Sequence, residues 1–91
     1  MDRNQVSKAK DQMEAAAYAL VTGESWATFE SFMENYMTIS EYDLLSCSTF
    51  DVFTAIRKDM DAVLALVSSI RVNADKHKTK LEAKGEDANE Q

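Results

Sequence analysis

The chain has 91 residues, of which two are glycine, one is cysteine and none is proline. Folds rich in β-structure need many tight turns, which glycine and proline commonly form, so this composition predicts an all-α fold built from a few long helices. A chain of this length forms one domain, and it is small enough that burying sufficient apolar surface within a single copy is difficult. We therefore predict a single helical domain over residues 1–85.

The formal net charge is −6, and the acidic excess lies in the middle of the sequence. Residues 22–61 hold eight acidic residues against Arg57 and Lys58, whereas the segments on either side are balanced. An acidic centre repels nucleic acid and anionic lipid and attracts a basic protein. A solvated acidic face that keeps a small protein soluble is the simpler interpretation.

The single cysteine and the polar N-terminal residues indicate a cytoplasmic protein. Cys47 has no partner for a disulfide within the chain, which favours a reducing compartment. Residues 2–5 are polar or charged, and the start of the sequence does not resemble a signal peptide. The longest uncharged runs fall short of the roughly 20 residues that a membrane-spanning helix needs.

The first predicted helix covers residues 4–21. It begins after Asp2 or Asn4, either of which can cap it, and it ends at Gly23 in a left-handed C-cap. The three alanines of residues 15–17 leave one side thin enough for another helix to approach closely. Its apolar residues follow the alternating three- and four-residue steps of a helix that lies along another helix, and they are Val6, Ala9, Met13, Ala16 and Leu20.

The second predicted helix covers residues 25–37 and carries half of the aromatic residues of the chain. These rings are either the core of a small domain or an adaptable surface, rich in methionine and aromatic residues, for the helix of a partner. In the second interpretation the rings act as hot spots and the acids steer a basic partner. The predicted partner-binding residues are Trp26, Phe29, Glu30, Met33, Glu34 and Tyr36.

Residues 38–49 are predicted to form a connector that contains a short helical turn over residues 41–46, with Ser40 as its start signal. Ser48 is the expected cap of the last helix, which we place at residues 49–84. Gly85 follows as its C-cap, and residues 86–91 have nothing to bury and are predicted to be a disordered acidic tail.

The last helix predicts a homodimer. At 1.5 Å per residue it would be about 52 Å long, so two shorter helices folded back on each other at Gly23 would cover only about half of it. Val52, Leu64 and Leu66 flank its main apolar seam, and an apolar arc of this width needs more than one neighbour. We expect a second copy to cover the second half; the alternative is that the helix loses order near Ala74. The predicted self-association residues of this coiled-coil seam are Met60, Val63, Val67, Ile70, Ala74, His77 and Leu81.

The sequence contains no residue pattern typical of catalysis or of metal binding. His77 is the only histidine and Cys47 the only cysteine, and neither has other ligand or catalytic residues at a suitable spacing. The sequence also lacks a glycine-rich phosphate loop, a Gly-x-Ser-x-Gly turn and a His-Glu-x-x-His motif. We therefore predict a protein that is not an enzyme and binds no cofactor.

These patterns favour a small acidic interaction protein, an adaptor, inhibitor or regulator that acts as a helical homodimer on a basic protein. One alternative is a role related to nucleic acid, either as a DNA mimic through the acidic centre or by direct binding through a basic stripe. Another alternative is a helical subunit that assembles through its seams. The basic stripe consists of Lys76, Lys80 and Lys84. Because Asp75 and Glu82 interrupt it, the sequence favours the interpretation that these lysines are the solvated end of a helix.

Overall fold

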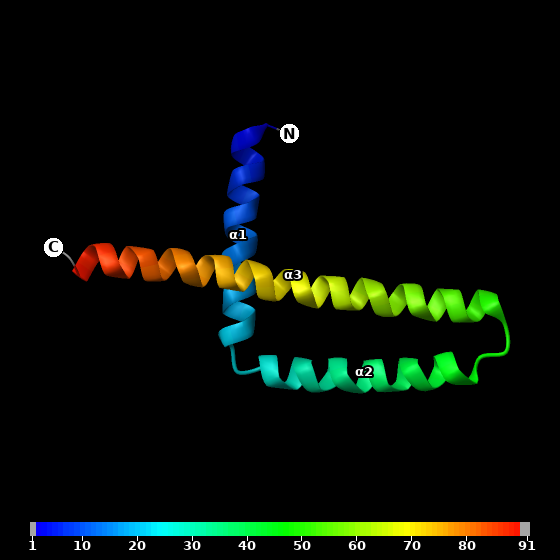
Figure 1. The fold of residues 1–91 in the computed structure, drawn as a ribbon. Helices are drawn as coiled ribbons and strands as arrows, with labels where there is room; N and C mark the ends of the chain where they lie inside the picture. Colours follow the sequence, from blue (N-terminus) through cyan, green and yellow to red (C-terminus); the bar gives the residue numbers. More distant parts are fainter. Residues whose placement is uncertain (1, 90–91) are drawn as a thin grey trace. The chain divides into compact units, whose positions relative to one another are not determined.

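The structure is a computed structural model that describes residues 2–89. These residues form three helices: α1 (Arg3–Thr22), α2 (Trp26–Ser46) and α3 (Phe50–Asn89) (Figure 1). No strand occurs between residues 2 and 89, so the predicted all-α class is confirmed for this part of the chain.

The chain divides into two compact units that share α3. The hairpin unit, Glu24–Val67, contains α2 and the first part of α3, which run antiparallel (Figure 1). The crossed unit, Met1–Gly23 with Ser68–Gln91, contains α1 and the second part of α3. The expectation that α1 and α2 cover only one half of the long helix is therefore wrong, because each of them packs against a different half.

The division into units is also a division of charge. The hairpin unit holds eight of the sixteen acidic residues but only two of the ten basic residues, so it carries the entire formal net charge of −6. The crossed unit is neutral by the same count. The acidic centre of the sequence is thus one structural unit.

The start of α1 follows the sequence prediction and its end does not. Asp2 caps the helix in a capping box, in which its side chain accepts a hydrogen bond from the Gln5 N–H and the Gln5 side chain accepts one from the Asp2 N–H. Gly23 is extended, with φ −78° and ψ 160°, and not left-handed. Its N–H still satisfies one carbonyl of the last turn, that of Leu20, at 3.2 Å.

α2 is one continuous helix through Ser46, without the predicted break after Met37 and without a separate turn over residues 41–46. No glycine or proline interrupts this stretch. Ser40, expected to start the turn, is instead a small buried residue inside α2. Polar side chains on either side bond to the helix backbone, as when the Thr38 hydroxyl donates to the Glu34 carbonyl at 3.0 Å.

The ends of α3 also differ from the prediction. Thr49, and not Ser48, precedes the first turn, and its hydroxyl accepts a hydrogen bond from the Val52 N–H at 3.3 Å. α3 continues through Gly85 to Asn89, because a single exposed glycine costs a helix only about 1 kcal/mol relative to alanine. The predicted tail, residues 86–91, is thus helical as far as Asn89, and residues 90 and 91 lie outside the described residues.

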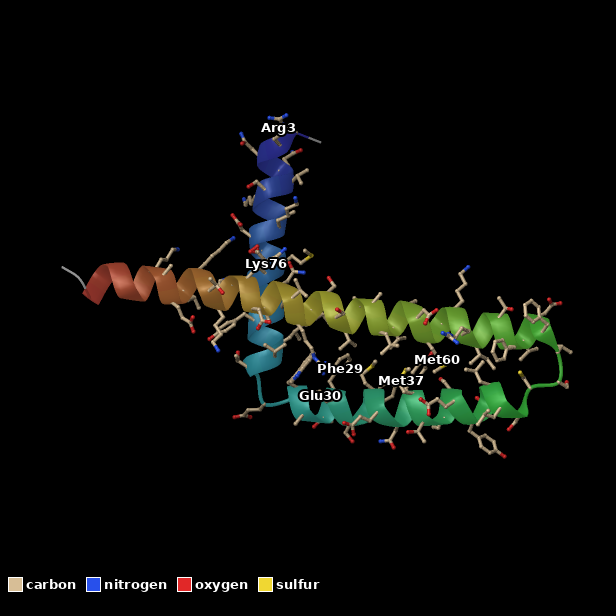
Figure 2. All side chains as sticks on the ribbon, in the orientation of Figure 1. Arg3, Phe29, Glu30, Met37, Met60 and Lys76 are labelled. Carbon is tan, nitrogen blue, oxygen red and sulfur yellow. The ribbon has the colours of Figure 1, made fainter. Side chains whose placement is uncertain are left out.

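Heptad packing builds the hairpin unit. On α2 the half-buried or buried residues include Trp26, Met33 and Ser40 at heptad position a and Phe29 and Tyr36 at position d. On α3, Met60 occupies position a and is buried. Figure 2 shows Phe29 and Met37 of α2 and Met60 of α3 in the space between the two helices.

The crossed unit buries a different face of α1 from the predicted one. α1 crosses α3 steeply (Figure 1), so only a short segment of each helix makes contact. Ala17 of α1 and Ala74 of α3 are both buried. The predicted seam of α1 lies elsewhere, since its Met13 and Leu20 are exposed. The alanine run does provide the close approach, through Ala17.

Truncation of the buried methionine should destabilise the hairpin unit. We expect Met60→Ala to lower the free energy of unfolding by about 2–3 kcal/mol, because it removes buried contacts and leaves a cavity. Leu45→Ala, at the most exposed of the large apolar residues, should change it by no more than about 0.5 kcal/mol. Urea denaturation followed by Trp26 emission measures both, and equal effects would contradict the assigned packing.

Candidate protein-binding surface

Of the predicted partner-binding residues of α2, all but Glu34 are half-buried. Trp26, Phe29, Met33 and Tyr36 are half-buried at positions a and d, on the side of α2 that faces α3. The rings of Trp26 and Phe29 contact each other, with centroids 5.1 Å apart. Glu30 is half-buried and Glu34 is exposed. Most of this aromatic face therefore packs inside the hairpin unit.

The predicted self-association residues are likewise engaged within the chain. Met60 is buried in the hairpin unit and Ala74 in the crossed unit. The His77 ring contacts the Tyr18 ring of α1, with centroids 5.2 Å apart. Val63, Val67 and Ile70 are half-buried, and Leu81 is exposed. The seam of α3 is thus largely occupied by the α2 and α1 helices of the same chain.

A second apolar stripe lies exposed on one side of the hairpin unit, at heptad position g of both helices. Phe32 and Ile39 occupy this position on α2 and are 66% and 62% exposed. Val52 and Leu66 occupy it on α3 and are 48% and 61% exposed. In an antiparallel pair the g positions of both helices fall on the same side. We call these four residues the g-side stripe.

The g-side stripe is unusual because position g usually carries charged residues. Asp59 is the single charged residue at this position between α2 and the first part of α3. A helix that is apolar at positions a, d and g has the pattern of a bundle helix with two neighbours. Each helix of the hairpin unit has one neighbour within that unit, so the stripe leaves space for another helix.

The opposite side of the hairpin unit is mixed in character. Position e holds Glu30 on α2 and Arg57 on α3 among apolar residues. Arg57 forms an exposed ion pair with Asp61, with 3.6 Å between its Nε and the carboxylate oxygen. Phe50 and Leu64 are the exposed apolar residues of α3 at this position. This side therefore provides a matched comparison for the g-side stripe.

The turn of the hairpin surrounds a shallow hollow of about 400 Å³. The thiol of Cys47 lies there and donates a hydrogen bond to the Leu44 carbonyl at 3.1 Å, at the end of α2. This contact gives the half-buried cysteine a structural role in closing the helix end. The hollow is lined by Leu44, Cys47, Ser48, Thr49, Phe50 and Phe53.

An ion pair that no local sequence pattern reveals joins α1 to α3 in the crossed unit. The Lys80 ammonium donates to the Glu14 carboxylate at 2.8 Å and to the Asp11 carboxylate at 3.3 Å. The Glu14 side chain is only 8% exposed, whereas that of Lys80 is 56% exposed. Hydrogen bonds to Glu14 and then to Asp11 raise the pKa of Lys80 above its ordinary value of 10.5. Residues 66 positions apart in sequence form this pair, so no local pattern could predict it.

The basic stripe of α3 is reduced by this pair. Lys80 is its central residue and is bound by two carboxylates of α1. Among the residues that the structure describes, no group of three or more histidine, cysteine or acidic side chains is placed to hold a metal ion. Within the same residues, every helix is too short or too polar to cross a membrane.

Comparison with known proteins adds no family to this description. No protein-family model, no curated protein and no solved structure matches the chain.

Removal of the Lys80 ammonium should destabilise the crossed unit, because the buried Glu14 carboxylate would lose its cation. We expect Lys80→Met to lower the melting temperature at neutral pH, and Glu14→Leu combined with Lys80→Met to restore most of the loss. Thermal unfolding followed by circular dichroism measures these changes.

The same pair should give a pH-dependent contribution to stability. The pKa of Lys80 is raised in the folded state, so its contribution is complete below pH 10.5 and is lost as the pH rises through the folded value. The melting difference between the original chain and Lys80→Met should therefore shrink in that range. A difference that stays constant up to the highest pH would show that charge is not its source.

Proposed function

We propose that the chain is a non-enzymatic protein–protein interaction protein and that the hairpin unit binds another polypeptide along the g-side stripe. The observation that carries this proposal is the stripe itself, in which four large apolar residues from two helices lie exposed on one side of an otherwise packed pair. Exposed apolar surface of this kind is typical of binding sites for protein partners.

The charge of the hairpin unit supports a partner of complementary charge. The unit carries a formal charge of −6, with Asp59 inside the stripe. Acidic residues around an apolar centre raise the rate of association with a basic partner and disfavour acidic ones. The fitting occupant is therefore a helix with an apolar face and basic residues beside it, in the helix-in-groove mode of recognition.

The homodimer expected from the sequence stays part of the proposal. Because much of the seam of α3 packs against α2 and α1, we place the second copy on another surface. Direct binding of nucleic acid through the basic stripe has less support, since its central residue, Lys80, is bound to Glu14 and Asp11.

Loss of the stripe should abolish binding without unfolding the chain. We expect Phe32→Ser with Leu66→Ser to reduce the amount of captured protein by about tenfold or more, because large side chains at an interface centre dominate binding energy. The experiment uses the immobilised chain and an extract of the cells that produce it, and a captured second copy counts as a partner.

Phe50→Ser with Leu64→Ser is the matched control, because it removes the same two residue types from the opposite side. Circular dichroism confirms that both double variants remain helical. Equal capture by the original chain and the Phe32 and Leu66 variant would contradict the proposed surface.

A further inference from the structure

We propose that the occupant of the g-side stripe is helix α1 of a second copy of this chain. This inference rests on the proposed function, because it names the partner of the same surface. The stripe and its charge specify a helix of a certain length, apolar on one face and basic beside it. α1 has these properties, and the apolar face in question is not used within its own unit.

The exposed face of α1 carries an apolar stripe of its own. Val6, Met13 and Leu20 recur at seven-residue intervals and are 39%, 50% and 53% exposed. The contacts of α1 with α3 involve other positions, such as Glu14, Ala17 and Tyr18. α1 therefore has an apolar face that α3 does not cover.

The lengths of the two surfaces agree. α1 has 20 residues and α2 has 21, so each extends over about 30 Å. A helix that docks along the side of the hairpin unit can thus contact it over its whole length. The three helices would form a bundle in which the a, d and g positions of α2 and α3 are covered.

Charge distinguishes α1 from the other surfaces of a second copy. Two hairpin units packed on each other would bring together two formal charges of −6. The crossed unit is neutral, and Arg3 and Lys10 lie three residues before Val6 and Met13 and so beside its stripe. These cations would face the acidic hairpin unit, which carries Asp59 within the docking surface.

Cross-linking between two differently tagged copies tests the inference. Both copies carry Cys47→Ser; one adds Met13→Cys, and the other adds Phe32→Cys or Ile39→Cys. Met13 lies near the middle of α1. Whether α1 docks parallel or antiparallel to α2, Met13 would therefore lie close to Phe32 or Ile39. We expect a short bismaleimide to link the introduced cysteines, so that one cross-linked product carries both tags.

Lys8→Cys replaces Met13→Cys in the control, because Lys8 lies on an exposed side of α1 away from its stripe. The yield with Met13→Cys should exceed the control by about tenfold or more, since groups held in a complex meet at a high effective concentration. Arg3→Glu with Lys10→Glu should lower the yield, whereas Lys8→Glu should not.

Equal yields from Met13→Cys and Lys8→Cys would overturn the inference. A second arrangement places both cysteines in the same copy. Cross-links that then form only within one chain, and never between two chains, would also overturn the inference. The proposed function fails separately, when the Phe32 and Leu66 variant captures as much protein as the original chain. If capture depends on the stripe but the captured protein is never a second copy, the function stands and this inference falls.

Discussion

Two helices packed side by side cannot cover all the apolar surface that this chain carries, and the rest of the structure depends on that constraint. Each helix of an isolated pair buries one seam, whereas α2 and α3 of the hairpin unit are apolar at a further heptad position. Within residues 2–85 the buried apolar residues are only Ala17, Met60 and Ala74. So small an interior leaves the apolar sides of the hairpin unit and of α1 as surfaces for further packing.

The distribution of charge differs between the two units that carry these surfaces. The hairpin unit carries the whole net charge, while the crossed unit balances its charges internally through pairs such as Glu14 and Lys80. An acidic docking surface disfavours a second acidic unit and favours a neutral or basic helix. Burial and charge thus select the same kind of occupant, a helix that is apolar on one side and basic beside it.

The sequence predicted much of this architecture because its signals are local. The lack of proline, the two glycines and the three- and four-residue spacing were enough to predict an all-α fold, and Asp2 with Gln5 marked the start of α1. The prediction was wrong where a serine resembled a cap: Ser40 is buried inside a continuous α2. A break after Met37 places Ile39 outside the predicted helix, so its seven-residue spacing from Phe32 does not indicate a continuous stripe.

Other features could not be predicted because they depend on contacts between distant residues. The seam Val6 to Leu20 indicated a packed face of α1, but the steep crossing with α3 selects the small Ala17 instead. Most of the predicted self-association residues of α3 are buried or half-buried within the chain, while Leu81 is exposed, since a heptad seam does not specify which helix occupies it. The Glu14 and Lys80 pair joins the two ends of the chain and has no local signature.

The central claim is that the open apolar side of the hairpin unit is covered by a second copy of the chain. The most direct measurement is the mass in solution by light scattering over a range of concentrations. The account predicts twice the chain mass of 10.2 kDa, with a return to the single mass in the Phe32→Ser and Leu66→Ser variant. A mass of one chain at every concentration would contradict it.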